Sequence, residues 1–397
     1  MTHRERMLAA MRGEATDQLP WAPRMDLWYL AQRARGTLPP QWNGMNIAEI
    51  ARELGVGCRA LGADRILPRD PSDLLLRGLG IDNHPDYPFR VALQRLQVEC
   101  HEDANRQEMR IQTSAGEVST RIRRTARMAA DGISVPFVEK YPVSSIEDLE
   151  GVAQVFEDLK VESTPEGYAA FRRRIGEGGP AIANGPPAAS PMHLLLHNLM
   201  SMEEFYLCYK EQRDLLQQFT RRIEPFFEAI LQAMLACNAE VISWGGNYDQ
   251  DLTWPPFFQE QILPWLQRVS RRAHACGKLV LTHTDGENHD LLMLYRSCSF
   301  DVAEAVCPAP MTRSTLAELR VGFGESITVW GGIPCVALLD NSMNAARYQR
   351  YMDRLFSELG SGRRLILGVS DNVPPDANMD RLRRVNEWIE QFGPVKV

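Results

Sequence analysis

From residue 180 onward, the chain repeats one pattern: a short apolar run ends in polar or glycine-rich residues, and an amphipathic helical segment follows. The six apolar runs occupy residues 181–187, 240–251, 278–286, 300–308, 327–335 and 364–372. Strands that alternate with helices in this way are expected to be parallel, with each helix crossing from one strand to the next. Two further short candidates, near residues 20 and 58, bring the number of strands to about eight, which is the number in a closed α/β barrel. The sequence therefore predicts an α/β fold of the (β/α)8 TIM-barrel type.

An open, doubly wound sheet is the main alternative to the barrel. That fold commonly carries a GxGxxG segment after its first strand, where the glycines let the backbone approach a dinucleotide. No such segment occurs here, so the closed barrel is the preferred prediction.

The chain before residue 180 is organised differently. Residues 1–75 are expected to hold N-terminal helical additions and the first strands. Residues 95–126 include a stretch that alternates polar and apolar side chains with a period of two around Ser114-Ala115-Gly116, which predicts an inserted β-hairpin with a solvated, charged face. Together with the regular βα units of residues 180–397, we expect these parts to form a single domain over residues 1–397.

The charge and the cysteines limit the cellular setting and the partners. A formal net charge of −7 argues against nucleic acid or an anionic membrane as the main partner. The charged opening MTHRERMLAAMRGE lacks the apolar centre of a signal peptide, so we expect a cytoplasmic protein. Eight cysteines are scattered without a CxxC pair, which predicts reduced thiols, most of them in the core.

Residues with chemical functions follow the apolar runs, where the strands of a barrel would end. The carboxyl ends of barrel strands form the active-site face. Residues of this kind at the six run ends are Asn184, Trp244, Asn247, Asp249, Asp251, His283, Asp285, Glu304, Cys307, Cys335, Ser370, Asp371 and Asn372. The N-terminal segment adds Arg24, Asp26 and Trp28.

One histidine, two cysteines and several carboxylates in this set are ligand types that bind zinc, which takes three or four of them. His283 and Asp285 are separated by one residue, so at a strand end both would face the same side. Cys307 follows His283 by 24 residues, about one βα unit. The pattern predicts a metal site, although each residue also has a structural interpretation. His283 would bond to backbone, the cysteines would be core thiols, Asp249 and Asp251 would cap the following helix, and Asp371 would cap a turn.

Several segments resemble the uroporphyrinogen decarboxylase superfamily, and the resemblance spans essentially the full chain. They are RERMLAAMRGEATDQLPW, ANGPPAASPMHLLLHNLMSMEEFY, GGNYDQD with PWLQRVSRRAHACGK, and LTHTDG followed by GGIP and GVSDNVPPD. The resemblance implies a (β/α)8 barrel with N-terminal helical additions. Decarboxylases of this superfamily carry an MRQAGR-like segment that binds the substrate carboxylates. The matching stretch here, PRMDLWYLAQRARG, keeps arginines but not the motif.

The other branch of the superfamily contains zinc- and corrinoid-dependent methyltransferases. Its thiol-methylating members carry His-x-Cys and a late cysteine, whereas this chain has His283-Thr284-Asp285 and, near the late position, Ser370-Asp371. Carboxylate ligands make zinc a harder Lewis acid, which suits an oxygen rather than a thiol. On this resemblance, His283 and Cys307 are expected as metal ligands, with Asp285 or Asp371 completing the set.

The leading interpretation is a methyltransferase of the O-demethylase type. It would move a methyl group from an O-methyl donor, such as a methoxylated aromatic, or from an N-methyl donor to the Co(I) corrinoid of a partner protein. The chain lacks a DxHxxG cobalamin segment of its own, and a homodimer would be consistent with the family. Candidate catalytic residues are Asp249 and Glu304, which would assist proton transfer. Candidate substrate-binding residues are Arg24, Asp26, Trp28, Trp244 and Asn247.

Two alternatives remain open at this stage. The first is a metal-independent decarboxylase or lyase of the same fold, in which Arg24 and Asp26 would hold a carboxylated small molecule. The second is a non-catalytic barrel that binds a small ligand.

Overall fold

The six apolar runs form a six-stranded parallel sheet in the computed structural model, which describes residues 1–61, 78–133 and 135–396. The strands are β7 (Ile182–Asn184), β8 (Val241–Gly246), β9 (Leu279–His283), β10 (Val302–Val306), β11 (Thr328–Pro334) and β12 (Leu365–Ser370). They neighbour one another in chain order from β7 to β12. Every residue of these strands is buried except the two end residues of β9. Burial on both faces explains why the runs are continuously apolar.

Two short segments continue the sheet beyond its edge strands. Trp21 forms a parallel bridge with Leu367 of β12, and Leu61 forms one with Ile182 of β7. The amide of Gly57 donates a 2.8 Å hydrogen bond to the carbonyl of Trp21, so the two segments also contact each other. They occupy the first and second strand positions and complete a ring of eight. The predicted (β/α)8 barrel is therefore confirmed.

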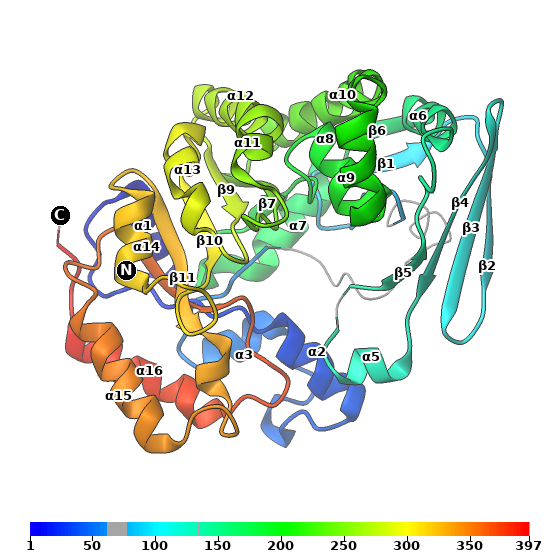
Figure 1. The fold of residues 1–397 in the computed structure, drawn as a ribbon. Coiled ribbons are helices and arrows are strands. Elements are labelled where there is room, and N and C mark those ends of the chain that lie inside the picture. Colours follow the sequence, from blue (N-terminus) through cyan, green and yellow to red (C-terminus); the bar gives the residue numbers. More distant parts are fainter. Residues whose placement is uncertain (62–77, 134, 397) are drawn as a thin grey trace.

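Helices connect the strands and lie around them (Figure 1). They are α8 (Pro191–Leu194), α9 (Met202–Glu211), α10 (Arg213–Ala236), α11 (Pro255–Phe257), α12 (Leu263–Ala275), α13 (Leu292–Cys298), α14 (Leu316–Phe323), α15 (Ala345–Ser357) and α16 (Met379–Phe392). Shorter turns are η3 (Leu195–Leu199), η4 (Phe258–Ile262), η5 (His289–Leu291) and η6 (Cys335–Leu338). The long helix α10 buries residues three or four positions apart, as the amphipathic pattern requires.

The N-terminal helix α1 (His3–Arg12) closes the amino-terminal end of the barrel. It begins with a capping box between Thr2 and Glu5 and ends at Gly13, whose φ of 76° favours glycine. Its apolar side chains belong to one buried cluster with residues from all six strands of the sheet. The cluster members from α1 and the strands are Met7, Leu8, Ala10, Met11, Ile182, Val241, Leu281, Val302, Trp330 and Ile366. Because this end is filled by side chains, the carboxyl ends of the strands are left for a functional site.

The remaining N-terminal elements are α2 (Asp26–Arg35), η1 (Pro40–Trp42) and α3 (Ile47–Glu53). They agree with the predicted helical additions, but the part of the predicted segment 1–75 that begins at residue 62 lies outside the described residues. In the described part of the chain, no helix combines the length and apolar character that crossing a membrane requires. All eight cysteines are free, and five of them are buried.

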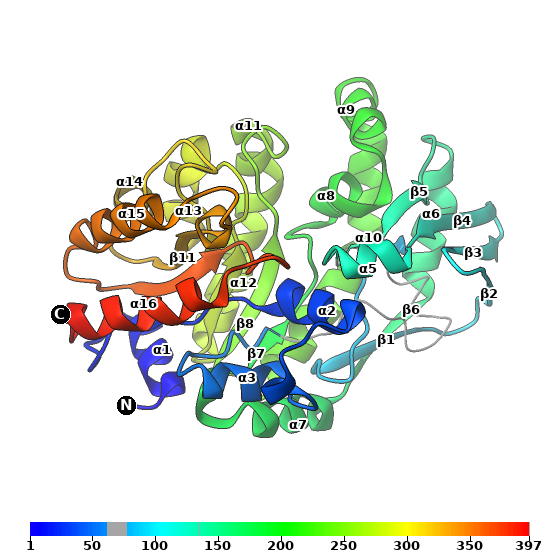
Figure 2. The ribbon, with the colours of Figure 1, turned by 90° about the horizontal axis from the view of Figure 1, so that it is seen from below.

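A four-stranded antiparallel sheet lies on the far side of the molecule from α14 and α15 in both views (Figures 1 and 2). Its strands are β2 (Val98–Glu102), β3 (Arg106–Thr113), β4 (Gly116–Arg123) and β5 (Phe137–Lys140), in that order. The predicted hairpin is the pair β3–β4, and β2 and β5 extend it at its two edges. Further elements between residues 89 and 178 of the chain are β1 (Phe89–Leu93), which pairs with β6 (Leu159–Ser163), and the helices α5 (Ala126–Ala130), α6 (Asp148–Asp158), α7 (Pro165–Ile175) and η2 (Gly176–Gly178).

Candidate metal and substrate site

Three of the four predicted metal ligands converge at the carboxyl ends of β9 and β12. His283 is the last residue of β9, Asp285 follows it by two positions, and Asp371 directly follows β12. The Nε2 atom of His283 lies 3.7 Å from Oδ1 of Asp371. One potential ligand atom from each of the three residues lies within 4.8 Å of the others. The arrangement can therefore offer one imidazole and two carboxylates to a single cation.

A cavity of about 320 Å³ opens beside these three residues. It lies within the size range of small-molecule sites. Apart from the three candidate ligands, its polar wall includes Arg24, Asp26, Arg59, Asn184, Ser243 and Asn247. Its apolar wall includes Leu27 and Leu30 from α2, together with Val135, Pro186 and Pro187. The predicted substrate-binding residues Arg24, Asp26 and Asn247 are thus found at the cavity.

Glu304 fixes the orientation of His283 from beneath. The two residues are direct neighbours in the pairing of β9 with β10, and Nδ1 of His283 lies 2.6 Å from Oε2 of Glu304. A proton on Nδ1 that is donated to Glu304 leaves Nε2 free to face the cavity and Asp371. Metal-binding histidines are commonly held by a carboxylate in this way. The contact therefore prepares His283 for the role of a ligand.

Arg59 keeps Glu304 ionised. The Nε atom of Arg59 donates a 2.5 Å hydrogen bond to Oε1 of Glu304, which is only 2% exposed. Burial alone would raise the pKa of Glu304, but the charges of Arg59 and His283 outweigh it and hold the pKa well below its ordinary value. An ionised carboxylate is suited to orienting His283. To act as the proton donor that the sequence predicts, it would first have to take up a proton.

A second pair of contacts ties the N-terminal segment to the site. Arg24 donates to Oδ1 of Asp371 at 2.6 Å and to Oδ2 of Asp26 at 3.1 Å. Burial favours the neutral form of Arg24, but Asp371, Asp26 and Glu304 outweigh that effect and raise its pKa. The same Oδ1 atom of Asp371 lies 3.7 Å from Nε2 of His283, so Arg24 also helps to position a candidate ligand.

The site carries an excess of negative charge. Four carboxylates (Asp26, Asp285, Glu304 and Asp371) face two guanidinium groups (Arg24 and Arg59), which leaves two carboxylates uncompensated. The pKa of Asp285 is raised, first by burial and then by the neighbouring Asp371, against the smaller opposing effect of His283. A positive charge beside Asp285 would relieve this repulsion, which makes the site favourable for a cation.

Cys307 does not join the ligand group. Its sulfur contacts the carbonyl of Pro308 at 3.9 Å, and burial, followed by nearby Asp285, raises its thiol pKa to about 12. Among the described residues, the group whose potential ligand atoms lie within 4.8 Å of one another contains His283, Asp285 and Asp371 but not Cys307. The structure therefore places the other three predicted ligands together without Cys307.

Three other predicted site residues make structural contacts away from the cavity wall. Trp28 packs edge-on against Trp42 with ring centroids 5.5 Å apart. Trp244 is fully buried, and its Nε1 donates to the carbonyl of Ala189 at 2.9 Å. Asp249 accepts backbone hydrogen bonds on both oxygens, at 2.8 Å and 3.0 Å, so it stabilises the loop that follows β8.

Arg59 is the site residue that the sequence analysis did not name. It belongs to the short second strand near residue 58, which was predicted, and it is 8% exposed. A buried arginine requires a carboxylate partner. A charged residue within a predicted barrel strand was therefore a usable signal for a residue that faces the site.

Comparisons with known proteins agree on the fold. A family model described as uroporphyrinogen decarboxylase (URO-D) matches residues 125–392. A search among curated proteins gave no match. Among solved structures, a methyltransferase from Methanosarcina mazei is similar, with a TM-score of 0.59 and 17% sequence identity over 99% of each chain. At this identity, the likeness shows a shared fold over the whole chain.

Proposed function

The chain belongs to the uroporphyrinogen decarboxylase family, and from this premise we propose that it is a methyltransferase. It would take a methyl group from an O-methyl donor, such as a methoxylated aromatic, or from an N-methyl donor, and pass it to the Co(I) corrinoid of a partner protein. The name of the similar structure from Methanosarcina mazei is consistent with this class of reaction. The convergence of His283, Asp285 and Asp371 beside the cavity is the observation that carries the proposal.

The donor set fits zinc. His283 presents Nε2 because Nδ1 is held by Glu304, and Asp285 and Asp371 add two oxygen ligands within reach of the same point. This leaves at least one coordination position for a substrate atom. A bound zinc ion would supply Lewis acidity toward the oxygen or nitrogen that carries the methyl group.

The residues around this centre would position the donor and keep the site closed to water. Leu27, Leu30 and Val135 would contact the apolar part of a methyl donor, and Asn247 would offer its amide. Transfer of the methyl group leaves its former heteroatom with an electron pair that must take up a proton. Asp249 and Glu304 remain the predicted sources of that proton, and of the two only Glu304 contacts a residue of the cavity.

A decarboxylase or lyase is the second candidate, because Arg24 and Arg59 both line the cavity. Each of them is already paired with carboxylates of the chain. A carboxylated substrate would therefore enter a site with excess negative charge. This repulsion makes methyl transfer the better supported proposal.

Metal content and methyl transfer can be tested on the same purified protein. We expect elemental analysis to find about one zinc per chain, since the three ligands form one site. With free cob(I)alamin as the acceptor, a methoxyphenol or methylamine should yield methylcobalamin, seen as loss of the Co(I) absorbance. His283→Ala should lose both the metal and the activity. His101→Ala, in the exposed strand β2, is the matched control and should keep both.

The alternatives give distinct results in this assay. Turnover of a carboxylated substrate that survives chelation would favour the decarboxylase. Saturable binding without turnover would favour a binding protein. A protein without stoichiometric metal, in which His283→Ala leaves methyl transfer unchanged, would contradict the proposal.

A further inference from the structure

A larger cleft, of about 900 Å³, lies at the opposite end of the barrel. It is lined by Ile327 and Val329 where β11 begins, and by Arg363 and Arg364 directly before β12. The ends of α13, α14 and α15 complete its wall. The cleft is therefore on the amino-terminal side of the strands, away from the candidate metal site.

Four arginines give this cleft a positive charge. They are Arg296, Arg320, Arg363 and Arg364. Within residues 1–61, 78–133 and 135–396, none of the four has a carboxylate oxygen within 4.0 Å. Two carboxylates, Glu325 and Glu358, also line the cleft, so four positive groups against two negative ones leave an excess of two positive charges. This excess occurs in a chain whose net charge is −7.

The hydrogen bonds that these arginines make go to neutral groups, most of them backbone carbonyls, with the hydroxyl of Thr328 and the sulfur of Met293 as the side-chain acceptors. Arg363 donates to Gly13 at 3.1 Å, and Arg364 donates to Met11 and Arg12 at 3.1 Å each, which caps the end of α1. Arg320 donates to the carbonyl of Arg363 at 2.9 Å and to that of Leu359, just after α15. A helix end carries roughly half a negative charge. Two such ends compensate only about one of the four guanidinium groups.

Two of the arginines are poorly solvated as well. Burial lowers the pKa of Arg320. Burial and then Arg363 lower that of Arg364, against a smaller opposing effect of Asp301. The Nε atom of Arg364 is also buried and has no hydrogen-bond partner in the described part of the chain. Folding thus brings guanidinium groups together without supplying an anion.

We propose that this cleft binds a phosphorylated small molecule. The planar guanidinium group matches phosphate oxygens with two parallel hydrogen bonds, which favours phosphate over other ligands. Arg296 and Arg363 are exposed and face the cleft, so they would supply these bonds. Val321, Ile327 and Leu359 offer apolar surface for an organic part of the ligand. The volume is in the range of small-molecule sites.

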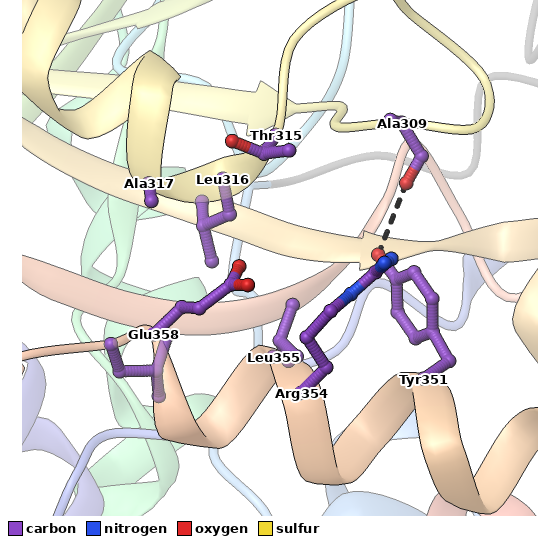
Figure 3. Close-up of a pocket in the computed structure, with 9 residues that line it drawn as sticks. Ala309, Thr315, Leu316, Ala317, Tyr351, Arg354, Leu355 and Glu358 are labelled. Carbon is purple, nitrogen blue, oxygen red and sulfur yellow. Dashed lines mark hydrogen bonds between the residues drawn. The ribbon is translucent and has the colours of Figure 1, made fainter.

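A small neighbouring cavity between α14 and α15 is a poor alternative for the ligand (Figure 3). It shares Ala317, Glu358 and Leu359 with the cleft but holds only about 30 Å³, room for a water molecule. Figure 3 shows Tyr351 bonded to the carbonyl of Ala309 at 3.1 Å, which closes it on one side. The larger cleft is therefore the part that can accept a phosphorylated molecule.

Calorimetric titration with inorganic diphosphate, and separately with a nucleoside diphosphate, tests the proposal at constant ionic strength. We expect saturable binding to the wild type. The double variant Arg296→Gln/Arg363→Gln should bind about a hundredfold more weakly, since each lost charge-assisted pair is worth roughly tenfold. The matched control is Arg173→Gln/Arg271→Gln, which removes the same charge from exposed positions on α7 and α12 and should bind like the wild type.

A comparison of the two affinities distinguishes an organic phosphate from inorganic diphosphate as the ligand of the cleft. Tighter binding of the nucleoside diphosphate assigns the site to an organic phosphate, and tighter binding of diphosphate alone overturns that part of the proposal. Equal affinity of the two double variants, or no saturable binding of either ligand to the wild type, overturns the site itself. Thermal unfolding of each variant checks its folding, and Arg296→Gln alone serves if the double variant does not fold.

Discussion

Glu304 is the residue on which the geometry of the candidate site depends most. Its two carboxylate oxygens are both engaged, one by Arg59 and the other by His283. The first contact keeps the carboxylate ionised and the second directs Nε2 of His283 toward Asp371. A single buried charge thus sets both the electrostatics and the orientation of the predicted ligand.

We expect Glu304→Gln to lower the free energy of unfolding by about 3 kcal/mol at neutral pH, because Arg59 then loses its buried countercharge. The pKa of Glu304 is lower in the folded chain than its ordinary value of 4.5. Its stabilising effect is therefore complete above that pH and is lost as the pH falls through the folded-state pKa. Urea denaturation at several pH values should show a difference between wild type and variant that is constant near neutrality and smaller in acid. The exposed Glu14→Gln is the control, and a difference that grows in acid would contradict the assignment.

The convergence of the three candidate ligands could be predicted from the sequence, whereas the position of Cys307 relative to them could not. His283 ends β9, Asp285 lies two residues beyond it and Asp371 directly follows β12, so the rule that strand ends meet at one face was sufficient. Cys307 follows β10, where the pairing register shifts between Glu304 and Val306 and Ala305 has a φ of 65°. Such an irregularity breaks the alternation of side chains along a strand. The side of the sheet on which the Cys307 side chain lies therefore cannot be inferred from the alternation along β10.

Helix α1 is the element that covers the amino-terminal end of the barrel interior. Its apolar face packs against residues from all six strands, and the hydroxyl of Thr328 at the start of β11 donates to the carbonyl of Ala10 at 3.0 Å. The same helix end accepts hydrogen bonds from Arg363 and Arg364. Its position therefore closes the barrel interior and also contributes to the arginine cleft.

Leu8→Ala should destabilise the chain by about 3 kcal/mol, because it leaves a cavity in this buried cluster. Leu8 is 3% exposed, whereas Leu207 on α9 is 50% exposed. Leu207→Ala is therefore the matched control and should change the free energy of unfolding by less than about 0.5 kcal/mol. Guanidinium denaturation measures both. Equal effects of the two substitutions would mean that α1 does not support the barrel.

At the level of elements, the sequence predicted the strands better than the limits of the inserted sheet. Short continuous apolar runs that alternate with amphipathic helical segments are typical of parallel strands buried on both faces, so β7 to β12 were recognisable. The inserted sheet was predicted as one hairpin around Ser114-Ala115-Gly116, which joins β3 and β4, whereas a second tight turn joins β2 to β3, with the amide of Asp103 donating to the carbonyl of Arg106. Strand β5 begins at Phe137, after the intervening helix α5, and its pairing with Arg123 of β4 is a long-range contact. Local alternation does not contain that information.

On the scale of the whole molecule, charge is divided between the two ends of the barrel. The carboxyl end gathers four carboxylates against two arginines, and the amino end gathers four arginines against two carboxylates. The buried cluster of α1 and the strands separates them. Each end is suited to a ligand of opposite charge, a cation at one and a phosphorylated anion at the other. The net charge of the sequence hides this division, because the two excesses cancel in the sum.

Removal of the proposed zinc ion should lower the stability of the whole barrel, because its candidate ligands come from the ends of β9 and β12 and meet only when the barrel is folded. At a free zinc concentration about a hundredfold above the dissociation constant, binding stabilises the folded state by about 2.7 kcal/mol. For a chain of 397 residues, this corresponds to a midpoint of thermal unfolding about 3 °C higher. Chelation should therefore lower the midpoint of the wild type, and added zinc should restore it. His283→Ala should unfold at the same temperature with and without the chelator. An equal shift in both proteins would place the metal elsewhere, and no shift in the wild type would show that zinc binding does not stabilise the fold.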